Sequence, residues 1–225
     1  MNLFDILGPI MVGPSSSHTA GAVRMGSMAR ALLGQPPVKA RLLLHGSFHS
    51  TGQGHGTHQA LVAGLLGLSP DDARVPDSFA MAKEQGLEFS FDTIAFRDAH
   101  PNSALIQLEG ADGGTMEVAA SSLGGGRIRV FQVNGLPCSF GGELPTLVVH
   151  NTDQPGCVSQ VTGVLARRGL NVATLQLNRD GRGERAVMVI ESDHVIYASA
   201  ADEIRALPGI LRVTRYTPEG MVDES

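Results

Sequence analysis

The sequence predicts an α+β protein of two domains, the first spanning residues 1–140 and the second residues 146–225. In the first part, segments with helical spacing of apolar residues are interspersed with strand-like segments. In the second part the predicted elements follow the order β-α-β-β-α-β, which is typical of a ferredoxin-like fold. Between the two, glycine and proline punctuate residues 135–145, and this pattern predicts a linker.

The first predicted helix follows a run of polar residues. Its apolar residues recur at helical spacing over residues 22–32, and Gly34 with Pro36 ends it. Unpaired backbone N–H groups and the helix dipole favour an anion at a helix start. We therefore expect a carboxylate or phosphate to bind the five polar residues there, Ser15, Ser16, Ser17, His18 and Thr19. A serine run can also be only an N-cap, but one cap uses one hydroxyl and histidine is not a capping residue.

A glycine-rich segment follows the strand predicted over residues 39–48. It carries glycines at the alternate positions 52, 54 and 56, and a helix is predicted next over residues 60–66. Glycine lets the backbone approach a ligand, although this spacing is not the dinucleotide-binding fingerprint. Five of the eight histidines lie between His18 and His58. Such crowding suggests proton transfer or metal binding, and the alternative is a set of solvent-exposed loop histidines.

The rest of the first part is predicted to be mainly strands. We expect a loop and helix over residues 75–91 and strands at 88–96, 104–109, 115–121 and 127–133. His100 and Asn102 lie in the turn before the second of these strands. The glycines at 124–126 indicate either a bulge or a close approach to a ligand or partner.

The second part begins with a strand at residues 147–150 and a turn at 151–156. Helices are predicted at 158–168 and 200–207, and further strands at 172–177, 186–191 and 211–216.

Composition excludes several classes of function. The net charge of −5 and the lack of a Lys/Arg cluster argue against nucleic-acid binding. No apolar run approaches the ~20 residues of a membrane span, and residues 1–7 lack the basic start of a signal peptide. Cys138 and Cys157 form no CxxC pair. Two cysteines are also too few for an iron–sulfur cluster, which normally takes about four thiolates. We therefore expect a cytoplasmic protein with reduced cysteines, no membrane partner and no metal ligands of its own.

Two short motifs in the second part resemble the ACT domain, a regulatory module that binds amino acids in metabolic enzymes. They are Asp153-Gln154-Pro155-Gly156 and Gly169-Leu170-Asn171-Val172. The segment is most similar to the serine-sensing module of phosphoglycerate dehydrogenase. That similarity implies self-association through this domain, and effector contacts from Asn151, Asp153, Gly156 and Asn171. An amide and a carboxylate can hold an ammonium group, and a helix start at Gly156 offers N–H groups to a carboxylate.

Four motifs in the first part resemble the beta chain of the iron–sulfur L-serine dehydratases. They are Gly13-Pro14-Ser15-Ser16-Ser17-His18-Thr19, Gly46-Ser47 with Gly52-x-Gly54-His55-Gly56-Thr57, His100-x-Asn102, and Gly124-Gly125-Gly126. The resemblance implies an N-terminal α/β domain of the allosteric-substrate-binding type. The family usually carries an aspartate after the loop threonine, and this chain has His58 there.

The same resemblance implies deamination of L-serine to pyruvate and ammonia together with an alpha chain. The cysteines of the alpha chain would hold a 4Fe–4S cluster that acts as a Lewis acid on the substrate. In this chain the resemblance implies His55 as the base for the Cα proton and His18 as a further catalytic residue. The implied substrate contacts are Ser15, Ser16, Ser17, Thr19, Gly46, Ser47, Thr57, His100 and Asn102.

Two other functions stay open at this point. One is a non-catalytic amino-acid sensor, because the same N-terminal module occurs as a substrate-binding regulatory domain in some phosphoglycerate dehydrogenases. The other is a zinc hydrolase built on the histidines between His45 and His58.

Overall fold

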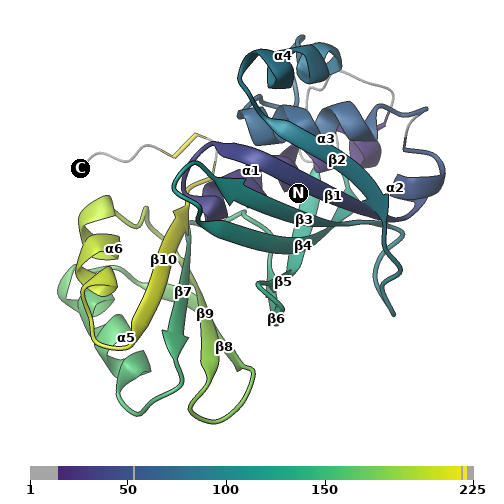
Figure 1. The fold of residues 1–225 in the computed structure, drawn as a ribbon. Helices are drawn as coiled ribbons and strands as arrows, with labels where there is room; N and C mark the ends of the chain where they lie inside the picture. Colours follow the sequence, from purple (N-terminus) through teal and green to yellow (C-terminus); the bar gives the residue numbers. More distant parts are fainter. Residues whose placement is uncertain (1–14, 53, 219, 222–225) are drawn as a thin grey trace. The chain divides into compact units, whose positions relative to one another are not determined.

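The computed structural model describes residues 15–52, 54–218 and 220–221 (Figure 1). The chain divides into two compact units, Met1–Asn134 and Gly135–Ser225. Both units combine helices with a sheet, which confirms the predicted α+β class. Within the described residues, no helix has both the length and the apolar character that crossing a membrane requires.

The first unit has helical segments η2 (Ser16–Ala20, a π-helix), α1 (Gly21–Leu33), α2 (Ser47–Ser50), α3 (Thr57–Leu66), η3 (Val75–Asp77) and α4 (Ser78–Glu84). Its strands are β1 (Pro37–Gly46), β2 (Glu88–Thr93), β3 (Asn102–Gly110), β4 (Thr115–Gly124) and β5 (Arg127–Val133). These strands belong to a sheet of the order β2-β1-β3-β4-β5-β6, whose last strand, β6 (Leu136–Phe140), follows the unit boundary in the chain. β1 runs parallel to β2 and antiparallel to β3.

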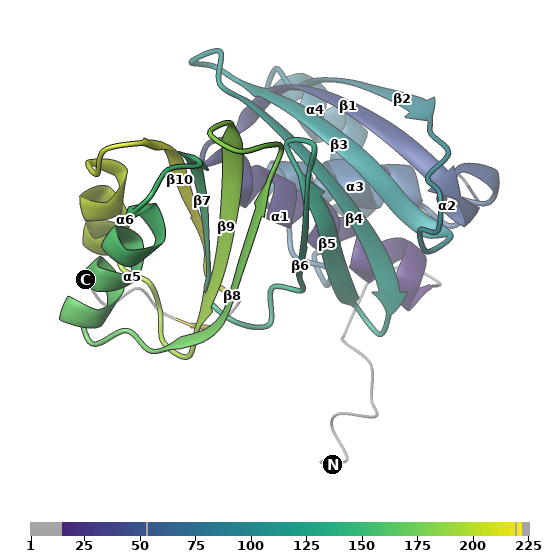
Figure 2. The same ribbon diagram turned by 90° about the horizontal axis from the view of Figure 1, so that it is seen from below.

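One face of this sheet is covered by helices and forms the core of the unit. Leu42 and Leu44 of β1 are fully or almost fully buried, whereas the alternating Lys39 and Arg41 are exposed. Because side chains alternate across a strand, the two pairs lie on opposite faces of the sheet. In Figure 2, α3 and α4 lie behind the strands, and we place the buried Leu42 and Leu44 on that face. Burial on this side therefore holds the helices against β1.

Helices α1 and α3 touch backbone to backbone. A Cβ atom built on Gly64 of α3 would lie 2.0 Å from the carbonyl oxygen of Val23, and one on Gly26 of α1 would lie 2.3 Å from that of Leu61. No real Cβ atom tolerates either distance, so both positions require glycine. The Ser27 hydroxyl also donates to the Gly64 carbonyl at 3.4 Å. This contact brings the start of α1 and the start of α3 to the same end of the sheet.

The second unit continues with β7 (Thr146–Thr152), α5 (Cys157–Arg167), β8 (Val172–Arg179), β9 (Arg185–Ser192), α6 (Ala198–Arg205) and β10 (Ile210–Tyr216). Its sheet has the order β10-β7-β9-β8, with antiparallel neighbours. The apolar side chains of α5 and α6 pack on one face of it, around the buried Val149, Met188 and Ile190. This is the predicted ferredoxin-like arrangement.

Residues 135–145, expected to be a linker, contain strand β6. Leu136, Cys138 and Phe140 are buried and alternate with exposed residues, which is a strand pattern. Asn134 and Gly135 have φ angles of 48° and 83°, the positive pair of an Asn-Gly hairpin turn. The glycine and proline content of the segment hid this signal. The linker prediction was therefore wrong over the length of β6.

The triple glycine forms the turn between β4 and β5. Gly125 and Gly126 have φ angles of 60° and 75°, and the strand register shifts between Ser122 and Gly124. The Gly126 carbonyl accepts a hydrogen bond from the Arg24 guanidinium at 3.1 Å. The turn is therefore tied to α1, the helix that begins next to the polar segment.

We expect Gly64→Ala to lower the free energy of unfolding by about 1–3 kcal/mol, because the added methyl group has no room against the Val23 carbonyl. Gly163→Ala in α5 is the matched control. A Cβ atom at Gly163 would meet its nearest neighbour, an Arg167 nitrogen, at 3.6 Å, so alanine there should stabilise by up to about 1 kcal/mol. Urea unfolding followed by circular dichroism measures both. A Gly64→Ala protein as stable as the unmodified one would contradict the tight helix contact.

Candidate functional site

The candidate site lies where η2 and the loop before α3 come together, beside the end of β1 and the start of β3. Figure 2 shows η2 in purple at this end of the sheet, with α2 at the tip of β1. Segments far apart in the sequence therefore supply the predicted site residues. The side chains of Ser16 and Ser17 lie outside the described part of the structure.

His18 is half-buried at the centre of this region. Its ring lies 5.5 Å from the ring of Phe48 and 5.0 Å from that of His55, measured between centroids. Its Nδ1 atom lies 3.3 Å from the Ser15 hydroxyl, and its Nε2 atom lies 3.4 Å from the Thr51 hydroxyl. Both ring nitrogens therefore have a hydroxyl neighbour.

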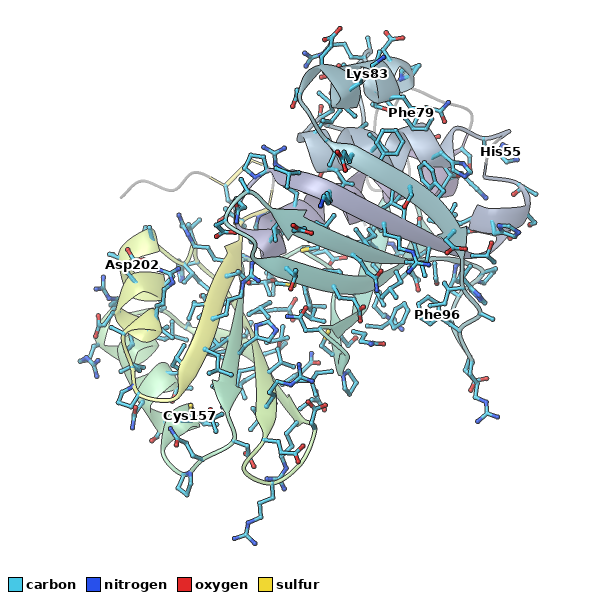
Figure 3. All side chains as sticks on the ribbon, in the orientation of Figure 1. His55, Phe79, Lys83, Phe96, Cys157 and Asp202 are labelled. Carbon is cyan, nitrogen blue, oxygen red and sulfur yellow. The ribbon has the colours of Figure 1, made fainter. Side chains whose placement is uncertain are left out.

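His55 lies on an exposed loop whose backbone is held in place. The His55 N–H donates to the Gly52 carbonyl at 3.3 Å, and the Thr19 hydroxyl donates to the His55 carbonyl at 3.5 Å. Gly56 follows with a φ of 71° and precedes α3 directly. Figure 3 places His55 at the outer end of this loop, where the side chain is exposed. The loop thus presents an imidazole to solvent next to His18.

Two of the predicted motifs meet at the junction of β1 and β3. Gly46 pairs with Asn102 across the strands, and the Ser47 N–H donates to the Pro101 carbonyl at 2.8 Å. A Cβ atom at Gly46 would lie 2.5 Å from that carbonyl oxygen, and its φ is 56°, so only glycine fits. The Asn102 N–H donates to the Nδ1 atom of His100 at 3.1 Å. Residues of these two motifs are therefore neighbours in space.

Thr57 and Thr51 complete the cluster. Thr57 is fully buried, and its hydroxyl has no hydrogen-bond partner among the described residues. Thr51 is exposed and donates to the Ser47 carbonyl at 2.9 Å. Sequence reasoning did not single out Thr51 or Phe48. Phe48 lies between the polar residues Ser47 and His49, and this isolated apolar residue was the available signal for a buried side chain beside the site.

Burial lowers the pKa of His18 below its ordinary value, and the neighbouring His55 lowers it further. Burial and a second positive charge each disfavour the imidazolium form, and a hydrogen bond to the Ser47 backbone opposes them by a smaller amount. His18 is therefore neutral at pH 7. A neutral imidazole beside hydroxyl groups and a second imidazole is an arrangement suited to proton transfer with a bound substrate.

The histidines between His45 and His58 do not converge on one point. His45 accepts the Phe96 N–H at 3.3 Å, His49 lies 3.0 Å from the Thr93 hydroxyl, and His58 packs edge-on against Phe91 at 4.3 Å. Across the described ranges, no group of three or more His, Cys, Asp or Glu residues could hold a metal ion. The geometry therefore gives no support to a zinc centre on these histidines.

The two cysteines do not suit an iron–sulfur cluster either. Burial raises the pKa of Cys138 to about 12 and also raises that of Cys157 (labelled in Figure 3). The two free thiols lie on different elements, Cys138 on β6 and Cys157 at the start of α5, and a cluster normally takes about four thiolates. This chain does not offer a ligand set for such a cluster.

The residues expected to bind an effector are divided between two ends of the second sheet. Asn151 pairs with Ala186, whereas Asn171 precedes Val172, which pairs with Ser192. Six residues along β9 separate these points by roughly 20 Å. One copy of the chain therefore does not bring Asn171 to Asn151, Asp153 and Gly156, because strand register sends the two turns to opposite ends.

Asp153 and Asn171 are also engaged within the chain. The Asp153 carboxylate accepts the Arg179 guanidinium at 2.6 Å and the Gly183 N–H at 3.2 Å. These hydrogen bonds lower the pKa of Asp153. The Asn171 amide donates to Asp193 at 2.5 Å. An ammonium ligand at Asp153 would compete with a guanidinium that is already present.

Comparison with known proteins confirms the two resemblances drawn from the motifs. A family model described as "Serine dehydratase beta chain" matches residues 2–132, and one described as "ACT domain" matches residues 146–209. A probable L-serine dehydratase beta chain of Bacillus subtilis is 37% identical over 95% of this chain and 97% of its own length. The L-serine dehydratase beta chain of Peptoniphilus asaccharolyticus is 36% identical over 98% and 97%. A D-3-phosphoglycerate dehydrogenase of Bacillus subtilis is 23% identical over 85% of this chain and 36% of its own.

We expect His55→Gln to raise the pKa of His18, because the substitution removes the neighbouring positive charge. The pKa should stay below its ordinary value, since burial is the larger cause of the shift. A titration of the His18 ring followed by NMR measures the change, with His49→Gln as a control that leaves the His18–His55 contact intact. An unchanged His18 pKa in His55→Gln would argue against electrostatic coupling of the two rings.

Proposed function

Because this chain belongs to the family of serine dehydratase beta chains, we propose that it is the beta subunit of an enzyme that converts L-serine to pyruvate and ammonia. The observation that carries the proposal is the 5.0 Å contact of His18 and His55 beside the hydroxyl-rich start of a helix. This arrangement combines anion-binding groups with a proton acceptor, which the elimination of water from serine requires.

The carboxylate of L-serine binds at the start of η2 and α1. The backbone N–H groups at this helix start supply neutral donors, and the helix dipole favours the negative charge. Ser15, Ser16, Ser17 and Thr19 belong to this part of the proposal through the family motif. The remaining contacts in this proposal come from the β1–β3 junction and the loop before α3, namely Gly46, Ser47, Thr57, His100 and Asn102. Their role as substrate contacts rests on the family motifs and on their proximity in the fold.

His55 takes the Cα proton. Its ring is exposed on a loop whose backbone is anchored, so the imidazole can reach a substrate without refolding of the loop. Loss of the Cα proton and of the β-hydroxyl as water leaves an aminoacrylate, which tautomerises to an imine and hydrolyses to pyruvate and ammonia. His18 is neutral in this step, because a second positive charge at 5.0 Å would oppose protonation of His55.

The iron–sulfur cluster of this proposal belongs to an alpha chain. The beta-chain naming of the relatives supports a separate partner, and the two cysteines of this chain are fewer than the about four thiolates that a cluster normally takes. The active site is then shared, with substrate-binding and proton-accepting groups supplied by this chain.

The ACT domain associates with a second copy of itself through strand β8. β8 is an edge strand, so one side of its backbone is not paired within its sheet. It also carries two exposed leucines, Leu175 and Leu177, which are 38% and 40% exposed. Pairing of two such edges buries the leucines and extends the sheet.

A regulatory protein without catalysis is the second candidate function. The similarity to a D-3-phosphoglycerate dehydrogenase favours this function. It covers 85% of this chain but 36% of the dehydrogenase, so most of this chain resembles one part of an enzyme that is named for a different reaction. The two functions differ in whether this chain is required for turnover.

The first test is anaerobic co-expression with the alpha-type chain and an assay of pyruvate formed from L-serine. We expect His55→Ala to lower kcat by about 10²–10⁴-fold with unchanged cluster content, because the proton acceptor is gone. His49→Ala, which removes a nearby histidine bonded to Thr93, is the control and should keep full activity. Full activity in His55→Ala would exclude His55 as the base. Activity of the alpha chain alone would favour the regulatory function.

The second test concerns self-association. We expect Leu177→Glu to convert a dimer of the full chain into a monomer, as measured by sedimentation equilibrium, since it places charge on the paired edge. Leu211→Glu is the matched control, because Leu211 is 59% exposed on β10, the opposite edge of the same sheet. A Leu177→Glu protein that remains dimeric would place the contact elsewhere.

A further inference from the structure

We propose that Thr51 is a positioning residue that keeps the ring proton of His18 on Nε2. His55 is then the imidazole of the pair whose ring nitrogens are available to take a proton from the substrate. The inference rests on the proposed function for its consequence in catalysis. The tautomer itself follows from hydrogen-bond directions in this chain and is tested separately below.

The direction of the hydrogen bonds around Thr51 follows from its single proton. The Thr51 hydroxyl lies 2.9 Å from the Ser47 carbonyl oxygen, which can only accept, so Thr51 donates to it. That leaves the Thr51 oxygen as an acceptor toward the Nε2 atom of His18, 3.4 Å away. The imidazole must therefore be the donor in this contact, and its proton lies on Nε2.

The other side of the ring agrees with this assignment. In a neutral imidazole with the proton on Nε2, the Nδ1 atom is an acceptor. The Ser15 hydroxyl lies 3.3 Å from Nδ1 and can donate to it, while the Ser15 oxygen accepts the His18 backbone N–H at 3.2 Å. Donors and acceptors thus alternate from Ser15 through His18 and Thr51 to Ser47.

The consequence for the pair of histidines is a division of roles. Both ring nitrogens of His18 have hydroxyl neighbours, and the ring also has a hydrogen bond to the Ser47 backbone, whereas among the described residues the ring nitrogens of His55 make no hydrogen bond. His55 is also the more exposed of the two rings. Of the two neighbouring imidazoles, His55 is therefore the one available to take a proton from a substrate.

Thr51 also links two parts of the proposed substrate site. Its backbone N–H and its hydroxyl both donate to the Ser47 carbonyl, and the Ser47 N–H donates to the Pro101 carbonyl next to Asn102. Through these bonds the orientation of His18 depends on the β1–β3 junction. A valine at position 51 keeps the shape of threonine and removes only the hydroxyl.

The tautomer is read from long-range ¹⁵N–¹H NMR spectra of the full beta chain labelled at histidine, with the His18 signals identified from a His18→Gln sample. We expect the Nε2–H form for His18 in the unmodified chain and a smaller share of it in Thr51→Val, because the Ser47 backbone, the other hydrogen-bond partner of the His18 ring, is kept. Thr93→Val is the matched control, because it removes the hydroxyl next to His49 and should leave His18 unchanged. A His18 ring with the same share of the Nε2–H form in Thr51→Val as in the unmodified chain would overturn the proposal.

Activity of the complex with the alpha chain tests the catalytic consequence. Thr51→Val should lower kcat about tenfold, the effect expected for one hydrogen bond, with a smaller change in KM, and Thr51→Ser should restore it. A changed tautomer with unchanged kcat would overturn the role in catalysis. An inactive unmodified complex would count against the proposed function instead, and the NMR result would still decide the tautomer.

Discussion

The backbone contact between α1 and α3 is the constraint on which the candidate site depends. Glycines at positions 26 and 64 let the two helices approach until a Cβ atom would lie 2.0–2.3 Å from a carbonyl oxygen of the other helix. The polar segment before α1 and the glycine loop before α3 are continuous with these helices. Close packing therefore brings His18 and His55 together. Thr19, the residue after His18, contacts His55 although the two are 36 positions apart in the chain.

The chemical character of the site follows from the absence of charge in the residues that build it. Serine, threonine, asparagine, histidine and glycine make up the named set, so a substrate carboxylate would be held by hydroxyls, backbone N–H groups and a helix start. A lysine or arginine in the same position would bind a carboxylate more strongly but would also disfavour a protonated imidazole nearby. Neutral donors allow anion binding and proton transfer to take place side by side.

The sequence was sufficient to predict the ferredoxin-like order and the polar start of the first helix, because periodicity and capping chemistry are local. It was not sufficient where strand register decides the outcome. Asn151 and Asn171 lie in similar turns, yet pairing along β9 sends them to opposite ends of the sheet. Strand β6 was missed because an Asn-Gly turn signal lay inside a segment rich in other turn residues. The role proposed for Thr51 rests on the direction of its hydrogen bond to His18, a contact between distant parts of the chain that no sequence pattern predicts.

His58 illustrates how a departure from a family pattern can be absorbed by packing. The motif resemblance implies an aspartate after the loop threonine, where this chain has His58. In this chain the His58 ring packs edge-on against Phe91 of β2, and burial lowers its pKa, so the ring is neutral at pH 7. An aromatic contact thus anchors the start of α3 to the sheet. The anchor adds no negative charge to the loop that carries His55, because it is a contact between two uncharged rings.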